Sequence, residues 1–314
     1  MMENVVKAGI FGVCIGDALG VPVEFKKRKD LKKAPVSGYL EYMSWSQPKG
    51  TWSDDSSLTF CLTEELAKRY DLEKIGQSFV KWYKYGHWTA HGKLFDIGGT
   101  TRHSIARLIK GESARFSGCI SEEDNGNGSL MRILPLAFYL KEEENIEKLY
   151  QMVKEVSAIT HGHFRSVFSC FIYVIFAIQL LKGKSKAEAY GYMQRTALEY
   201  AESQGFNPKE TGLFHRILKN NIFNDKEDEI QSGGYVLNSL EASLWCFMNS
   251  ESYPEAVLKA VNLGDDTDTT GAITGGIAGI YYGFENIPRE WVSELVRKDD
   301  IENLCIRFAN KLMK

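Results

Sequence analysis

The stretch VFSCFIYVIFAIQLLKG (167–183) has helical spacing and carries apolar side chains on every side. Polar residues flank it and it is short for a membrane helix, so we expect it to be the central helix of a bundle. Helical periodicity recurs in SLTFCLTEELAKRY (57–70) and NSLEASLWCFMNS (238–250), whereas the alternation typical of strands is rare. The sequence therefore predicts an all-α fold.

Length, composition and charge bound the kind of protein. The 314 residues, 44% of them hydrophobic, are enough to bury one large core, and no internal repeat or low-complexity linker divides them. We therefore expect a single compact domain over residues 1–314. The net charge of −3 leaves no basic footprint for nucleic acid or an anionic membrane, so any phosphate site must be local.

Cysteine spacing and the first residues indicate the cytoplasm. The six cysteines lie far apart without a CxxC pair, which is typical of reduced thiols in an intracellular core. MMENVVKAGIFGVCIGDALG (1–20) places an acid and a lysine before a short apolar stretch broken by glycines, which makes a poor secretory signal. No run is long and apolar enough to span a bilayer. We expect a soluble cytoplasmic protein and assume a monomer, because the sequence does not reveal the oligomeric state.

Polar residues first break the core pattern in GTWSDDSSLTF (50–60). Ser53, Asp54 and Asp55 come directly before an amphipathic helix, where such side chains cap free amide groups and suit the positive end of the helix dipole. Capping does not need two adjacent carboxylates, however. Taken alone, the segment leaves both helix capping and a ligand site open.

A second acidic cluster lies in NLGDDTDTTGAITGGIAGIYYG (262–283). Asp265, Asp266 and Asp268 precede a helix whose small residues allow close packing. Three acids within four residues repel one another unless a cation neutralises them. Because distant parts of a compact bundle can lie side by side, two such clusters at helix starts indicate a shared metal site.

The ligand types narrow the choice of metal. Carboxylates and hydroxyls without neighbouring Cys or paired His are hard oxygen donors, which favour magnesium or manganese over zinc. Asp266, Asp268 and Thr269 would form one half of the site. The other half would consist of Ser53, Asp54 and Asp55.

Two further carboxylates stand in unusual surroundings. Glu24 follows Pro22 in the otherwise apolar loop of GDALGVPVEF (16–25), where a carboxylate needs a partner. Asp96 precedes two glycines and a helix start in LFDIGGTTRHS (94–104). These positions make both residues candidates for the same site.

Two segments offer groups for a phosphate. GNGSLMRILPLAF (126–138) begins with residues whose backbone amides could approach a phosphate closely at a helix N-terminus, although glycine-rich helix starts are common without ligands. THGHFRS (160–166) places His161 and His163 ahead of the central helix. Such a histidine is either a packing or capping residue or a catalytic group.

Taken together, these segments resemble the ADP-ribosylglycohydrolases, a family that includes the dinitrogenase reductase-activating glycohydrolases. The resemblance runs in order across nearly the whole chain through GDALGVPVEF, TWSDDSSL, DIGGTTR, GNGSLMRILPL, ITHGH, SGGYVLNSLEASLW and GDDTDTTGAITGGIAGIYYG. It implies an all-α orthogonal bundle with two divalent cations, Mg²⁺ or Mn²⁺, between the acidic clusters. It also implies hydrolysis of the bond between ADP-ribose and an acceptor on a modified protein, most often an arginine side chain.

Position by position, the resemblance implies residue roles. Glu24 matches an acidic residue at or near the metals, and Asp96 matches a pocket aspartate proposed to take part in catalysis. His161 matches a substrate-contacting histidine, and Tyr235 either packs against the substrate or is an ordinary buried tyrosine. The metal ligands match Ser53, Asp54, Asp55, Asp266, Asp268 and Thr269. The loop that holds the diphosphate and ribose matches Gly126, Asn127, Gly128, Ser129, Met131 and Arg132.

One position departs from a common form of the pattern. Many members of the family have glycine where this chain has Asp265, whose carboxylate either caps the helix or alters metal affinity. The ligand set is otherwise intact, which argues against a relative that has lost catalysis.

The chemistry expected is that of glycoside hydrolysis, in which positive charge develops at the anomeric carbon. Metals would bind the ribose hydroxyls and orient a water, while Asp55, Asp96 or Glu24 transfers protons. An enzyme acting on O-linked ADP-ribose, such as ADP-ribosyl-serine or O-acetyl-ADP-ribose, would share these motifs. A non-catalytic ADP-ribose binder or structural relative is the alternative from another class, and a metal-dependent phosphatase would leave the other five motifs unexplained.

Overall fold

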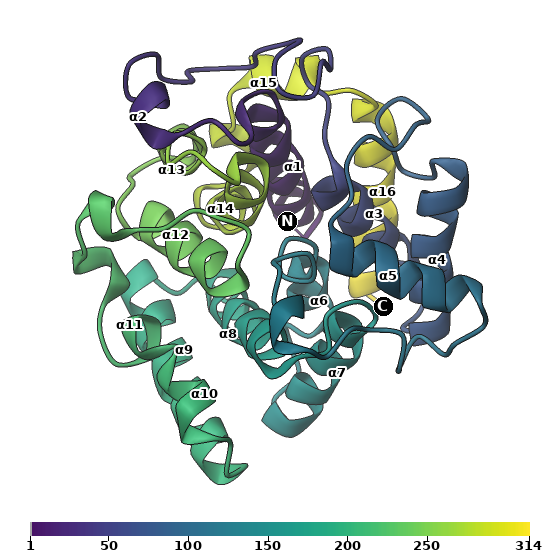
Figure 1. Ribbon diagram of the computed structural model, residues 1–314, viewed down its shortest axis with the longest axis vertical. Coiled ribbons are helices and arrows are strands. Elements are labelled where there is room, and N and C mark those ends of the chain that lie inside the picture. The colour runs from purple at the N-terminus through teal and green to yellow at the C-terminus, as the bar shows by residue number, and fades with distance from the viewer. Residues whose placement is uncertain (1) are drawn as a thin grey trace.

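Helices make up nearly all regular structure in residues 2–314, the part of the chain that the computed structural model describes (Figure 1). Within that range the only β pairing is two isolated bridges, Cys119 with His161 and Gly126 with Tyr235, so the predicted all-α fold is confirmed. Short 3-10 helices cover Val21–Val23, Glu122–Asp124, Ile222–Asn224, Glu227–Glu229 and Phe284–Asn286. The α-helices are α1 (Met2–Gly20), α2 (Arg28–Leu31), α3 (Asp54–Leu66), α4 (Leu72–Tyr85), α5 (Gly99–Ile109), α6 (Leu134–Tyr139), α7 (Ile146–Ala158), α8 (Phe164–Leu181), α9 (Lys186–Ser203), α10 (Pro208–Gly212), α11 (His215–Leu218), α12 (Val236–Met248), α13 (Tyr253–Val261), α14 (Thr267–Tyr282), α15 (Arg289–Glu294) and α16 (Lys298–Leu312).

The three helices predicted from periodicity are present as α3, α8 and α12, each beginning earlier than the apolar pattern. α3 begins at Asp54 because the Ser53 side chain caps it. α8 begins at Phe164 because the ring of His163 plays the same part. His163 is therefore a capping residue, one of the two roles that its sequence left open. Capping residues lie outside the apolar stripe of a helix. A helix start predicted from periodicity alone is therefore too late in the sequence.

Buried apolar helices form the core of the bundle. By length and composition two segments could cross a membrane, Met2–Val23 and Phe164–Leu181, so the expectation that no run is long enough is wrong as to length. Their apolar windows are 89% and 83% buried within the protein, however. α8 packs against α6, α7, α9, α12 and α14, as expected of a central helix. Both segments are core helices that are apolar because other helices surround them.

The closest helix pair is α1 with α14, which run side by side in Figure 1. Both helices carry glycine at every fourth position, so the glycines of each form one face. A side chain there would overlap the partner's backbone, as at Gly16 against Gly271 and Gly12 against Gly275. At the end of this seam Gly20 lies against the backbone of Asp268. The missing side chains let the carboxyl end of α1 and the amino end of α14 come together, and α3 packs against both.

Candidate metal centre and active site

The close approach of α1 and α14 assembles a first group of three carboxyls. Asp17 of α1, Asp55 of α3 and Asp268 of α14 each offer an oxygen within 4.8 Å of the others. All three side chains are buried. Oxygen donors at this spacing, from three different helices, are a suitable arrangement for a hard divalent cation.

Asp17 is a member of this group that the sequence interpretation missed. It sits within an apolar helix, where its position gives no sign of a ligand. Its carboxylate accepts the amides of Ser53, at 2.9 Å, and of Ser56, at 3.0 Å, together with the Ser56 hydroxyl at 2.5 Å. Asp17 thereby fixes the start of α3, and so the direction of Asp55, from a different helix. The GDALG segment could have drawn attention to it, because an acid among small and apolar residues needs a partner.

A second group shares Asp268 with the first. Glu24, Asp266 and Asp268 each offer an oxygen within 4.8 Å of the others. The indole Nε1 of Trp45 donates to the Glu24 carboxylate, and the Asn127 amide donates to Asp266 Oδ2 at 2.8 Å. Sequence analysis placed Glu24 at or near the metals, and the structure brings it beside two of the expected ligands.

Hydroxyl groups orient Asp55 within the first group. Ser53 Oγ donates to Asp55 Oδ2 at 3.0 Å and Thr269 Oγ1 donates to the same oxygen at 3.3 Å. The other oxygen, Asp55 Oδ1, is buried and has no hydrogen-bond partner within residues 2–314. A buried carboxylate oxygen left without a donor fits a metal ligand, because a bound cation satisfies it.

Burial and mutual repulsion raise the pKa of these carboxyls. Burial and then neighbouring carboxylates raise the pKa of Asp55 and of Asp268 well above the usual range. Burial and then the charge of Asp96 raise the pKa of Glu24 to about 8, against the opposing effect of the Trp45 hydrogen bond. Burial raises the pKa of Asp17 to about 6 although its hydrogen bonds lower it. The group is short of positive charge, which a divalent cation supplies.

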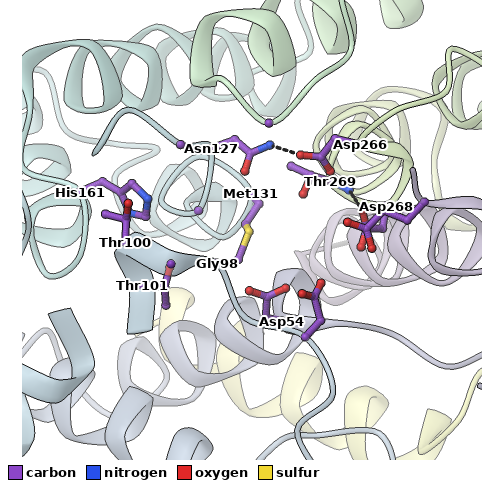
Figure 2. Close-up of a pocket in the computed structure, with 16 residues that line it drawn as sticks. Asp54, Gly98, Thr100, Thr101, Asn127, Met131, His161, Asp266, Asp268 and Thr269 are labelled. Atoms are coloured by element: carbon purple, nitrogen blue, oxygen red, sulfur yellow. Dashed lines mark hydrogen bonds between the residues drawn. The ribbon is translucent and has the colours of Figure 1, made fainter. Parts of the chain in front are cut away.

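The second group, which includes the shared Asp268, lines a cavity of about 240 Å³ whose two sides differ in charge (Figure 2). We call the carboxyl-bearing side the acidic wall: Glu24, Asp54, Asp96, Asp266 and Asp268. The other side, the neutral wall, consists of Gly98–Thr101, Gly126–Gly128 and His161. In Figure 2, His161, Thr100 and Thr101 lie across the cavity from Asp266, Asp268 and Thr269. No lysine or arginine lines the cavity within the described chain.

Asp54 and Asp96 form a carboxyl pair at the edge of the acidic wall. Burial and then the charge of Asp96 raise the pKa of Asp54 well above its usual range. Burial raises the pKa of Asp96 to about 6, while a hydrogen bond from Asp54 lowers it. Neither residue belongs to the two groups of close oxygens, and both face the cavity. Asp96 thus forms part of the cavity lining.

The neutral wall is built from two turns and one ring. Gly98 and Gly99 start α5, so the free amides of that helix lie beside the cavity. Gly128 is pressed against His161, because a Cβ on it would lie 2.8 Å from the ring carbon Cε1. Met131 completes the lining nearby. The predicted phosphate-holding loop therefore does reach the cavity through Gly126, Asn127, Gly128 and Met131.

Three residues predicted to bind substrate lie outside the cavity lining. Ser129 is buried in the core, where it accepts a hydrogen bond from Ser157. Arg132 is also fully buried, behind the loop. Tyr235 is half-buried at the start of α12 and pairs through its backbone with Gly126. The loop turns inward after Gly128 because α6 and its approach belong to the core.

Asp265 lies outside both groups of close oxygens. Its backbone has φ of +60°, in the left-handed region that favours glycine, and Lys27 pairs with its carboxylate at 2.9 Å on the surface. The N-cap of α14 is Asp266. Of the two roles considered for the Asp265 carboxylate, helix capping and altered metal affinity, the structure thus supports neither; it shows an ion pair.

Comparisons with known proteins agree with this geometry. A family model described as ADP-ribosylglycohydrolase matches residues 2–314. The chain is 33% identical over 304 residues to the "ADP-ribosylarginine hydrolase Tri1" of Serratia proteamaculans, covering 95% of this chain and 77% of the relative. It is 26% identical over 295 residues to the "ADP-ribosyl-[dinitrogen reductase] glycohydrolase" of Rhodospirillum rubrum, covering 93% and 90%. A solved structure described as an "ADP-ribosylglycohydrolase-related protein complex" has a TM-score of 0.81 and 26% identity, with 99% of both chains covered.

Proposed function

Because the chain belongs to the ADP-ribosylglycohydrolase family and is a glycosidic-bond hydrolase, we propose that it cleaves the N-glycosidic bond between ADP-ribose and arginine side chains of modified proteins. Two relatives named as ADP-ribosylarginine hydrolases, 33% and 29% identical, support arginine as the acceptor. The relative from Rhodospirillum rubrum, named for its action on dinitrogen reductase, supports a protein substrate.

The observation that carries the proposal is a cavity with an acidic wall and a neutral wall. The two groups of close oxygens, which share Asp268, support two divalent cations. Their donors are oxygens alone, which supports magnesium or manganese. Asp17, Asp55 and Asp268 would hold one cation, and Glu24, Asp266 and Asp268 the other.

The chain's own side chains account for the other requirements of the reaction. When bound, the cations supply charge that binds ribose hydroxyls and activates a water. The carboxylates of the acidic wall stabilise the positive charge that develops at the anomeric carbon. Asp96 faces the cavity without belonging to either group of close oxygens, so it is free to exchange a proton with water or the leaving group. Asp54 lines the cavity beside it.

Free cysteines support a place of action in the cytoplasm. All six cysteines are unpaired within residues 2–314, and five of them are buried. Reduced thiols are usual where glutathione keeps cysteines from forming disulfides. We therefore include the cytoplasm in the proposal.

The test is a release assay with two substrates. Purified protein is incubated with arginine-ADP-ribosylated and serine-ADP-ribosylated peptides in magnesium, manganese or EDTA, and free ADP-ribose is measured. Release from the arginine peptide alone, abolished by EDTA, is the expected result. Release from the serine peptide would overturn the choice of acceptor, and undiminished release in EDTA would overturn the role of the metals.

A further inference from the structure

Arg132 is a fully buried cation without an acidic partner. Its side chain is 0% exposed, and within residues 2–314 its hydrogen-bond partners are two backbone carbonyls and one hydroxyl, with no carboxylate among them. The guanidinium donates to the carbonyl of Gly128 and to Thr160 Oγ1, the latter at 2.8 Å, and lies over the ring of Phe79 at 4.8 Å. Burying an unpaired charge is unfavourable, so a residue of this kind calls for a role.

The contact with Thr160 determines how the next residue is protonated. Thr160 Oγ1 receives an N–H from Arg132, and it lies 2.7 Å from His161 Nδ1. The hydroxyl has no third partner within residues 2–314, so its own proton is satisfied only by donation to Nδ1. Nδ1 is then an acceptor, and the proton of the neutral imidazole resides on Nε2.

His161 is neutral in this setting. Burial, and secondly the charge of Arg132, lower the pKa of His161 to about 3. The ring therefore has one N–H at physiological pH, and the hydrogen bond from Thr160 places it on Nε2. This nitrogen lies toward the glycine loop, 3.5 Å from where a Cβ on Gly126 would stand.

The position of this N–H matters because the cavity is poor in positive charge. Five carboxylates line it, and no lysine or arginine does within the described residues. A diphosphate placed there needs donors from the neutral wall. Backbone amides of α5 are one source, and His161 is the ring in that wall.

We propose that Arg132 is a positioning residue that acts through Thr160 to fix His161 as an Nε2–H donor to the diphosphate of the ADP-ribosyl group. The inference rests on the proposed function, since ADP-ribose supplies the diphosphate. Arg132 does not reach the cavity, so in this proposal it affects substrate binding indirectly, through Thr160 and His161. The bond to the Gly128 carbonyl lets the same guanidinium hold the loop against which His161 packs.

The first experiment observes the tautomer directly. The protein labelled with ¹⁵N-histidine is examined by long-range ¹H–¹⁵N NMR near pH 7, with His161→Gln used to assign the signals. We expect the Nε2–H form for His161, with a Nδ1 resonance shifted by an accepted hydrogen bond. In Thr160→Val this Nδ1 resonance moves toward the value of an unbonded nitrogen, and Thr160→Ser restores it. A Nδ1–H tautomer in the unmodified protein would overturn the proposal.

The second experiment measures binding of free ADP-ribose by calorimetry. Loss of a positioned donor to a charged group predicts about ten-fold weaker binding in Thr160→Val, with recovery in Thr160→Ser. Thr63→Val is the matched control: it removes another buried hydroxyl, one that bonds within α3, and leaves affinity unchanged. In turnover assays Thr160→Val raises KM more than it lowers kcat. Equal affinity in Thr160→Val and the unmodified protein would refute the relay.

Substitution of Arg132 completes the series. Arg132→Lys keeps the charge and loses the forked geometry, so its affinity for ADP-ribose falls between that of the unmodified protein and that of Thr160→Val. If this variant does not fold, Arg132→Gln, which keeps an N–H group that can donate to Thr160, takes its place in the same measurement, and the Thr160 variants still test the bond to His161. Neither NMR nor ADP-ribose binding involves the acceptor. A failed arginine assay with intact results here overturns the proposed acceptor alone, and the reverse overturns the relay alone.

Discussion

The acidic wall and the neutral wall face each other across one cavity, yet they are built in opposite ways. The acidic wall is made of carboxyl side chains from the starts of α3 and α14 and from the loops that carry Glu24 and Asp96, and like charges at this spacing repel one another. The neutral wall uses backbone, hydroxyls and a neutral ring, and its shape is set by contacts such as Gly128 against His161. We therefore expect the acidic wall to depend on a bound cation for its stability and the neutral wall to be formed in advance.

The side chain of Asn127 connects the two walls. Asn127 belongs to the glycine loop, and its amide donates to Asp266 Oδ2 and to Ser239 Oγ, both at 2.8 Å. Figure 2 shows this amide reaching toward Asp266. Substitutions can therefore be made in the acidic wall, at Asn127 or in the neutral wall. Because the two walls are built differently, we expect each kind of substitution to change a different measured property.

The largest effect is expected in the acidic wall. Asp268 belongs to both groups of close oxygens, so Asp268→Asn should lower kcat/KM about 1,000-fold or more, equivalent to about 4 kcal/mol of transition-state stabilisation. Metal binding measured by calorimetry should weaken in parallel. Asp265→Asn is the control, since that carboxylate is paired with Lys27 on the surface and asparagine tolerates its φ of +60°. Equal activity of the two variants would place the metals elsewhere.

The next effect is on the stability of metal-free protein. The pKa of Glu24 is raised to about 8 and that of Asp17 and Asp96 to about 6, so the folded state binds more protons than the unfolded state between about pH 4 and 8. Folding stability in EDTA should therefore fall as pH rises from 5 to 8, and Glu24 alone should contribute about 3 kcal/mol of this fall, or about 6 °C in Tm. Saturating magnesium should reduce the fall, because cations bind the deprotonated carboxylates.

Thermal unfolding followed by circular dichroism measures this dependence. Glu24→Gln removes the carboxyl whose pKa is raised furthest of these three and should flatten the fall of Tm with pH in EDTA. A Tm in EDTA that is constant or rises over this range would show that the acidic wall is not strained without metal.

Loss of the Asn127 side chain should lower activity less than loss of the Asp268 carboxylate, and more than a change confined to the neutral wall. Asn127→Ala removes the donor to Asp266, and we expect activity to fall about 30-fold, as for other groups that orient metal ligands. Ser239→Ala leaves the bond to Asp266 and should have the smaller effect. Because Asn127 touches both walls, metal affinity and KM should change together. A change in KM alone would mean that Asn127 serves only the neutral wall.

The residues of the acidic wall and those of the neutral wall differ in how well they could be predicted from the sequence, and the reasons are physical. Asp54, Asp55, Asp266 and Asp268 could be chosen as candidate ligands from the sequence, because capping a helix start does not need two adjacent acids. Asp17 was missed because it lies within an apolar helix and becomes a ligand candidate only through the meeting of α1, α3 and α14. The close packing of α1 and α14 can be suspected from the glycine spacing of both helices. The spacing alone does not indicate which two helices pack together.

The neutral wall shows the other limit. A loop's residues can be identified from glycines, but the direction of each side chain depends on where the chain turns into the core. Of the residues predicted to hold the diphosphate and ribose, Gly126 to Gly128 line the cavity, whereas Ser129 and Arg132 are buried outside its lining. The all-α class was predictable from periodicity, while helix bounds moved with the caps at Ser53 and His163.

The smallest effect is expected in the neutral wall and is the sharpest test of its preformed shape. In Gly128→Ala the new Cβ would lie 2.8 Å from His161 Cε1 and 3.0 Å from Thr101 Oγ1, so the ring or the loop must shift. We expect KM to rise about ten-fold, equivalent to about 1.4 kcal/mol, with kcat and metal affinity nearly unchanged. Gly126→Ala should be milder, because its Cβ would meet no atom closer than 3.5 Å. Gly191→Ala, on the remote helix α9, controls for the added methyl group. A lower metal affinity in Gly128→Ala would show that the two walls are one mechanical unit, since a change confined to the neutral wall would then have displaced the acidic wall through Asn127.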